Sequence, residues 1–210
     1  MGRLRTPLAI PALVGALVLA GCAGTKMPRY YVLTPLAVVK AAPYPDGPAI
    51  GVGPIAVARY LDRPEIVTRT GSSRLLVADM EQWGDTLGDE VTRALAPDMS
   101  DLLATDRVWL YPWNDAAAPG LQVTVDIVRF EREAGGAVTL AAFWSISDGE
   151  TKRVLTSGRS TIVKTLDPAA KGAAGYEATV DLMSDALVSL GEDIAGAIEA
   201  MGPPRAAAAS

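Results

Sequence analysis

A long amphipathic pattern near the C-terminus constrains the fold more than any other feature of the sequence. Between residues 173 and 201, apolar side chains recur every three or four positions, at Val180, Met183, Leu187, Leu190, Ile194 and Ile198. This spacing predicts a long helix with one buried face, and Gly202 followed by two prolines predicts its end. Because such a helix must cover another apolar surface, we expect it to pack on a sheet.

A second apolar stripe predicts a helix over residues 81–104, with its members four residues apart: Trp83, Leu87, Val91 and Leu95. Asp79 is the expected N-cap, and Pro97 predicts a kink or a restart inside this helix. Glu81, Asp85 and Asp89 also lie four residues apart. We interpret them as an exposed acidic ridge rather than as a catalytic pair of carboxylates.

Alternating apolar residues predict strands through most of the remaining chain. We expect strands over residues 30–33, 50–57, 66–70, 74–78, 108–113, 121–127, 138–146 and 153–166, with turns at 71–73, 135–136 and 148–149. Gly158 is a candidate bulge in the last of these strands. The pattern predicts an α+β fold: a single domain over residues 30–201, in which an antiparallel β-sheet carries two long amphipathic helices packed on one face. Residues 202–210 are expected to form a disordered tail.

The composition argues against most enzyme chemistry. The 210 residues include no histidine and one cysteine, which excludes Ser-His-Asp and Cys-His nucleophiles and the usual zinc sites. The net charge of −5, without a long basic run, argues against nucleic-acid binding. Gly51, Gly53 and Ala56 have the spacing of a dinucleotide fingerprint, but a proline-rich loop precedes them and Pro54 interrupts them. We therefore predict that the protein is not an enzyme and has no metal and no dissociable cofactor.

The N-terminus has the pattern of a secretory signal. Basic residues precede an apolar stretch over residues 8–19, which is shorter than the about 20 residues that a membrane span needs. The next residues, Leu19-Ala20-Gly21-Cys22, resemble the bacterial lipobox. This resemblance implies cleavage before Cys22 and a covalent N-acyl diacylglycerol on that residue. The alternatives are an ordinary signal peptide with an incidental cysteine and an N-terminal anchor helix.

The lipobox predicts how the mature chain begins. Residues 1–21 are the expected lipoprotein signal peptide, and residues 22–29 the lipidated tether. Several acyl chains hold a protein on a membrane far more firmly than one chain does. Ala23 follows the cysteine, at the position where Asp retains lipoproteins at the inner membrane in enteric-type sorting. We therefore expect the protein at the outer membrane, on its periplasmic face.

One internal stretch resembles a known family. Residues 60–70, YLDRPEIVTRT, resemble the central signature of the auxiliary lipoproteins of ABC-type transporters, the family of paraquat-inducible protein C (PqiC). Other segments resemble this family in the same order: Tyr30-Tyr31-x-Leu33, Trp83, the strand over residues 107–113 and the final amphipathic helix. The chain departs from the family pattern at residues 85–87, where a proline is expected, and at Pro97.

The resemblance implies a role in lipid transport. It implies a non-catalytic subunit of a transport system with mammalian-cell-entry (MCE) domain proteins, which receives the periplasm-spanning MCE assembly at the outer membrane. The implied partners are the MCE-domain protein and, through it, an inner-membrane ABC permease and its ATPase. The implied assembly is a homo-oligomeric ring. A generic envelope-assembly lipoprotein and a periplasmic lipid-binding carrier with its own pocket are the alternatives.

The candidate interface residues come from the signature and from one tryptophan. In the signature they are Tyr60, Leu61, Asp62, Arg63 and Pro64. The Asp62-Arg63 pair has two interpretations, a contact to a partner or a structural pair that holds the loop to the domain. Trp83 and Trp144 follow the apolar spacing and are expected in the core. Trp109 lies out of register with its apolar neighbours and is the tryptophan that we expect at an interface.

Overall fold

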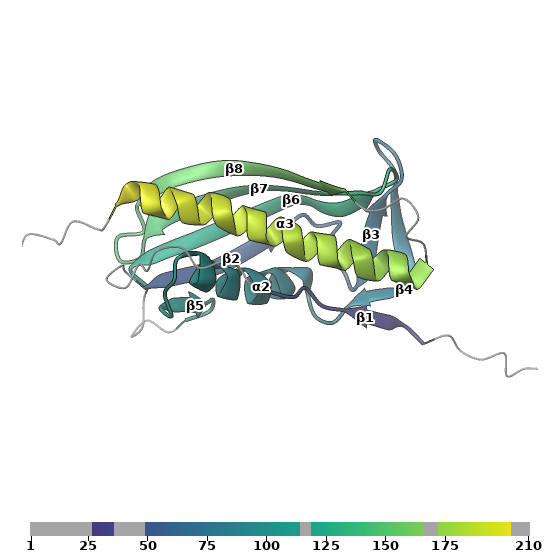
Figure 1. The fold of residues 1–210 in the computed structure, drawn as a ribbon, viewed down its shortest axis with the longest axis horizontal. Coiled ribbons are helices and arrows are strands. Elements are labelled where there is room, and N and C mark those ends of the chain that lie inside the picture. The colour runs from purple at the N-terminus through teal and green to yellow at the C-terminus, as the bar shows by residue number, and fades with distance from the viewer. Residues whose placement is uncertain (1–26, 36–48, 114–118, 166–171, 203–210) are drawn as a thin grey trace, which may run out of the picture.

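A computed structural model describes residues 27–35, 49–113, 119–165 and 172–202 (Figure 1). The predicted signal peptide, Cys22 and the predicted tail from residue 203 lie outside these ranges. Within them the chain forms an eight-stranded sheet and two long helices. The elements are β1 (Arg29–Tyr31), β2 (Ile50–Val57), β3 (Glu65–Arg69), β4 (Leu75–Trp83), α2 (Leu87–Leu102), β5 (Val108–Leu110), β6 (Leu121–Glu133), β7 (Ala137–Asp148), β8 (Val154–Thr165) and α3 (Gly172–Met201).

Strand β6 organises the sheet because it has neighbours along both edges. On one edge it pairs antiparallel with β7 along nearly its whole length, from Leu121 opposite Asp148 to Arg132 opposite Val138. On the other edge its first half pairs parallel with β2, and its last residues pair parallel with β3. Strand β8 extends the sheet beyond β7, and β1 extends it beyond β4. One long strand therefore joins the two halves of the molecule.

The predicted antiparallel sheet is correct only in part. The β3–β4 hairpin and the β6–β7–β8 meander are antiparallel. The sheet is mixed, however, because β1 with β4, β2 with β5, and β6 with both β2 and β3 are parallel pairs. Parallel strands are joined by a long crossover connection rather than by a tight turn, so no local turn signal in the sequence predicts their pairing. Alternation along a strand shows which side is buried, but not the direction of its neighbour.

The predicted pair of helices packed on one face is correct in part (Figure 1). The two helices pack against each other, but each covers different strands of the sheet. Helix α3 lies on β6, β7 and β8, and α2 lies on β2 and β5. The six apolar residues whose spacing predicts α3 are all buried. The core between helices and sheet is filled by large side chains such as Phe130, Leu140 and Met183. In the described ranges, no helix combines the length and the apolarity that crossing a bilayer takes.

The first helix begins later than predicted. Residues 81–83 belong to β4, because they pair with Arg29–Tyr31 of β1. Helix α2 therefore begins at Leu87, and its N-cap is Thr86 rather than Asp79; the Thr86 hydroxyl accepts the N–H of Asp89. Trp83 is buried as predicted, but from a strand.

The predicted acidic ridge is correct for the exposed Asp85 and Asp89 but wrong for Glu81, and the helix does not restart at Pro97. Glu81 is buried in β4 instead of standing on a helix beside Asp85 and Asp89. The helix continues through Pro97 to Leu102 as one element, with the proline ring exposed. A proline removes one hydrogen bond from a helix, and here the packing of the apolar face outweighs that loss.

Two predictions in the β7–β8 hairpin were wrong for local reasons. The turn at residues 148–149 is longer than two residues, since the Asp148 N–H donates to the Arg153 carbonyl and the strand resumes at Val154. The Asp148 carboxylate stabilises this loop by accepting the N–H of Thr151. Gly158 is not a bulge: it lies directly opposite Trp144, whose ring occupies the space of a side chain. Trp144 packs against the core but is only partly buried.

Candidate functional site

Residues 60–64 of the signature lie in the connection between β2 and β3, which is fixed at both ends and exposed in the middle. The Leu61 N–H donates to the Ala58 carbonyl at 2.8 Å, and the Leu61 side chain is buried. The Pro64 carbonyl accepts the N–H of Trp83 at 2.7 Å. Between these anchors, Asp62 and Arg63 are exposed, and so is the Pro64 ring. The loop therefore presents its central side chains from a rigid base.

The phenol of Tyr60 holds the loop to the far end of β6. Its hydroxyl donates to the Glu131 carboxylate at 2.6 Å, and Glu131 is fully buried. The same carboxylate accepts hydrogen bonds from the Arg69 Nε at 2.6 Å and the Arg129 Nε at 3.2 Å. Burial, and then the hydrogen bond to Glu131, raise the pKa of Tyr60 to about 12. Tyr60 is therefore a neutral donor at any physiological pH and a structural member of the signature.

Sequence reasoning missed Glu131. It lies on the polar side of a strand, and polar alternation predicts exposure there. The residues that bury it, Tyr60 and Arg69, come from 71 and 62 positions earlier in the chain. The only signal in the sequence was that the signature contains both a tyrosine and an arginine that need a partner.

Asp62 and Arg63 of the signature point to different neighbours. The Arg63 Nε donates to the Glu65 carboxylate at 2.9 Å across an exposed ion pair. Asp62 instead lines a shallow depression, so the two residues do not pair with each other to hold the loop.

This depression, which we call the Asp62 depression, has a volume of about 470 Å³ and joins four parts of the chain. Its lining residues are Pro54, Ile55, Ala56 and Val57 of β2, Asp62, the start of α2 at Thr86, Gly88, Asp89 and Thr92, and Tyr111 with Pro112 after β5. Two carboxylates, Asp62 and Asp89, lie beside apolar and aromatic groups. The depression thus offers a partner both an apolar contact and negative charge.

Two segments that carry the family resemblance meet at the Asp62 depression, the signature loop and the residues after β5. The start of α2, beside the departure from the family pattern at residues 85–87, forms another side. The Tyr111 ring is half-exposed and packs edge-to-face on Trp113, with 5.3 Å between ring centroids. Trp113 in turn covers Gly51 of β2, where an added Cβ would lie 2.7 Å from the indole. This packing holds Tyr111 at the rim of the depression.

The expected place of Trp109 at an interface stays a prediction. Trp109 is partly buried on β5, opposite Gly51, and is not among the residues that line the Asp62 depression. Tyr111 is the exposed aromatic residue there. Within the described ranges, no group of three or more His, Cys, Asp or Glu side chains is placed to hold a metal ion.

A comparison with known families identifies the chain. The family described as "ABC-type transport auxiliary lipoprotein component" matches residues 31–195. The chain belongs to this family. The resemblance seen in the signature is thereby confirmed, and it extends from β1 to the last turns of α3. No curated protein matches the chain.

Solved structures share the fold of this auxiliary lipoprotein. A Xanthomonas campestris protein of family DUF330 aligns with a TM-score of 0.66 at 19% identity, over 83% of this chain and 96% of its own. The crystal structure of an uncharacterized protein aligns with a TM-score of 0.63 at 18% identity, over 82% and 99% of the two chains. Identities this low relate the folds and nothing more.

The auxiliary lipoprotein holds its N-terminal strand with buried polar groups. The Arg29 guanidinium forms a two-pronged ion pair with Glu81, and the Tyr31 hydroxyl donates to the same carboxylate at 2.7 Å. Further along, the Leu33 N–H donates to the buried Glu90 carboxylate at 3.2 Å. The hydrogen bond from Arg29 holds the pKa of Glu81 below its ordinary value, although burial opposes this effect. The chain that leads from the predicted tether is therefore fastened to β4 and α2.

Replacing Glu81 by glutamine should lower the free energy of unfolding by about 2 kcal/mol at neutral pH, because the Arg29 and Tyr31 donors lose a charged acceptor. The pKa of Glu81 is depressed from its ordinary value of 4.5 in the folded state. Its stabilising contribution is therefore complete above that pH and is lost as the pH falls through the lower folded value. Urea unfolding at stepwise lower pH measures this. The difference between native protein and variant should shrink on acidification, and a constant difference would contradict the assignment.

Proposed function

We propose that this protein is a non-catalytic, lipid-anchored subunit of an MCE-type ABC lipid-transport system, and that the MCE assembly docks at the Asp62 depression. The acyl anchor on Cys22 holds the domain on the periplasmic face of the outer membrane. The permease and the ATPase in the inner membrane supply the energy, and phospholipid moves between the membranes through the MCE assembly. Copies of the lipoprotein form a ring around its end.

The observation that carries the proposal is that two segments with the family resemblance, the signature loop and the residues after β5, converge on one surface. Tyr60, Leu61 and Pro64 of the signature are taken up by structural contacts, which leaves Asp62 directed to the depression. Family-specific residues with no catalytic group among them are typical of a binding surface. The depression is shallow and mixed in polarity, as expected for a transient protein contact rather than for a pocket that encloses a small ligand.

The core gives no support to the alternative of a lipid carrier. A carrier needs an apolar cavity that encloses an acyl chain. Here the space between α3 and the sheet is occupied by packed side chains, and the facing residues Leu140, Leu187 and Ile194 are completely buried. Lipid is therefore expected to pass through the partner.

Reversing the charge in the depression should weaken capture of the MCE protein. The experiment uses the full-length tagged lipoprotein, solubilised from cell envelopes, with its MCE-domain partner detected by immunoblot. We expect Asp62→Arg combined with Tyr111→Ala to reduce capture at least about tenfold, which corresponds to ~1.4 kcal/mol. Asp62 is exposed and Tyr111 is half-exposed, so thermal unfolding should change little.

Asp181→Arg is the matched control, because Asp181 is exposed on α3 and does not line the depression. It should capture the MCE protein as well as the native protein does. If the native lipoprotein captures no MCE protein, the proposed function is wrong. If the native protein captures the MCE protein and the Asp62→Arg/Tyr111→Ala variant captures it equally well, the function stands and the docking surface lies elsewhere.

A further inference from the structure

Exposed apolar side chains gather at the end of the domain where the chain enters it. Met27 is 86% exposed and Tyr30 is 65% exposed, at the start of the described chain. Leu76 on β4 is 54% exposed, and it lines the same depression as Met27. This β4-edge depression has a volume of about 640 Å³ and is lined by Met27, Arg29, the β4 residues 76–81 and Tyr176. Large exposed apolar groups in one place usually contact something.

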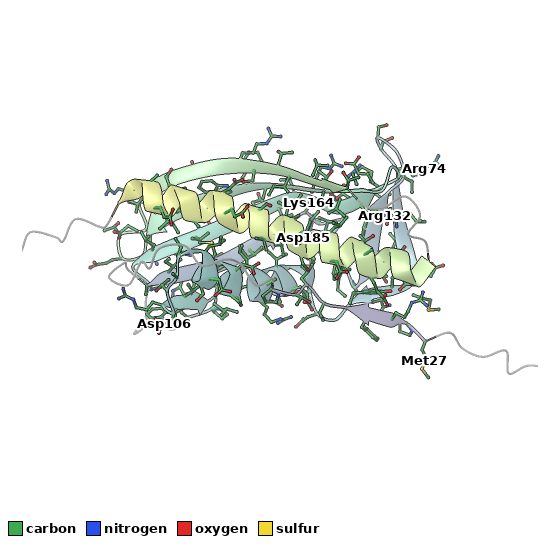
Figure 2. The ribbon with its side chains drawn as sticks, in the orientation of Figure 1. Met27, Arg74, Asp106, Arg132, Lys164 and Asp185 are labelled. Carbon is green, nitrogen blue, oxygen red and sulfur yellow. The ribbon has the colours of Figure 1, made fainter. Side chains whose placement is uncertain are left out.

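The docking surface proposed above does not account for this cluster. None of its residues lines the Asp62 depression. Strand β1 pairs only with the last three residues of β4, so among the described strands nothing covers residues 75–80 along that edge. Figure 2 places Met27 and Arg74 toward one end of the elongated molecule and Asp106, just before β5, toward the other.

The length of chain before Met27 identifies what can reach this surface. Four residues lie between Cys22 and Met27, and the five Cα–Cα steps that join them span at most about 18 Å in an extended chain. Because Arg29 is fixed to Glu81, Met27 cannot move away from the domain to lengthen the tether. With acyl chains on Cys22, the apolar end must therefore lie within this distance of the bilayer. A tyrosine beside apolar residues suits the boundary between headgroups and acyl chains.

We infer that this end of the domain rests on the membrane surface, with Met27, Tyr30 and Leu76 in the headgroup region of the bilayer. The inference rests on the proposed anchor at Cys22. The described charges at this end balance, because Glu81 neutralises Arg29 and Asp79 on β4 offsets Arg74 just before that strand. The apolar side chains carry the contact, so it should withstand high salt. The long axis then points away from the membrane, with β5 and the β7–β8 turn at the end that faces the periplasm (Figure 1).

Site-directed spin labels test this orientation in the acylated full-length protein. Cys22 is the only cysteine and acylation blocks it, so an introduced cysteine is the only free thiol. The label is attached to Leu76→Cys or, as the matched control, to Val154→Cys, because Val154 is 58% exposed on β8 near the far end. The proteins are reconstituted in phosphatidylethanolamine–phosphatidylglycerol vesicles. Collisions with oxygen, which enriches in lipid, and with a water-soluble nickel complex report the depth of each label.

We expect a severalfold higher ratio of oxygen to nickel accessibility for the Leu76 label than for the Val154 label, unchanged at high salt. Met27→Cys is a second position that should behave like Leu76→Cys. Equal, water-like ratios for both ends in vesicle-bound protein would overturn the inference while leaving the anchor intact. A ratio that collapses at high salt would overturn the apolar contact. Protein that does not float with the vesicles would overturn the anchor and the inference together.

Discussion

Replacing Glu131 by alanine should lower the free energy of unfolding by about 3 kcal/mol, because it leaves the partly buried Arg69 guanidinium and the Tyr60 hydroxyl without their carboxylate. Glu131 is completely buried and accepts hydrogen bonds from Tyr60, Arg69 and Arg129. Without it, Arg129 still pairs with Glu133. Among the described residues, Arg69 retains the Ser72 carbonyl, the face of the Tyr60 ring and the nearby charge of Glu133. Urea unfolding at neutral pH measures the loss.

Two variants make this expectation specific to the buried charge. Glu131→Gln keeps the shape and some of the hydrogen bonds, so it should lose clearly less than Glu131→Ala. Glu65→Ala removes the carboxylate of the exposed Arg63–Glu65 pair and should leave the unfolding curve almost unchanged, because exposed ion pairs contribute little. If Glu131→Ala resembles Glu65→Ala, Glu131 does not hold the signature loop to the sheet.

Replacing Gly158 by valine should lower the free energy of unfolding by about 3 kcal/mol, at the upper end of what overpacking usually costs. A Cβ at this position would lie 2.2 Å from the indole of Trp144, far inside contact distance. The indole is held in place, since its Nε1 donates to the Ser160 hydroxyl at 3.0 Å and that hydroxyl donates to Asp193 on α3. Moving the indole would therefore also disturb the hydrogen bonds that join the sheet to α3.

Gly196→Ala is the control of opposite sign. Gly196 is exposed on α3, and nothing lies within 4 Å of an added Cβ. Alanine there should stabilise the protein by up to about 1 kcal/mol, which is the difference in helix propensity. Denaturant unfolding followed by tryptophan fluorescence compares both variants. A Gly158→Val protein as stable as the native one would show that the Trp144 ring is free to move aside.

The signature of the family has a divided role in this molecule. Tyr60 and Leu61 face inward and fix the loop, and Pro64 uses its carbonyl to hold β4. Asp62 alone is directed toward the depression where α2 begins. Most of the motif thus consists of residues that hold the loop in place, and one exposed side chain lines the depression. The sequence alone does not distinguish these two roles, so it left the role of Asp62 and Arg63 open.

Local periodicity was a reliable guide where one element determines its own burial. The six apolar positions of α3 predicted its buried face, and the predicted bounds of β2, residues 50–57, agree with the structure. The failures occur where distant residues decide. Glu81 has helical spacing in the sequence, but pairing with Arg29 across 52 positions keeps it in a strand. Glycine can form a bulge in a strand, but Gly158 instead leaves room for the Trp144 ring, which lies where a side chain would be.

The sequence by itself determined the two amphipathic helices, most of the strands and the family, because each depends on a pattern of neighbouring residues; the anchor at Cys22 stays a prediction. Only the tertiary structure decided that the sheet is mixed, that Glu131 lies buried beneath the signature loop, and that the residues around Asp62 and Tyr111 meet in one depression. These features depend on contacts between segments that are far apart in the chain. Such contacts are selected by the packing of the whole domain, and they leave no periodic trace in any one segment.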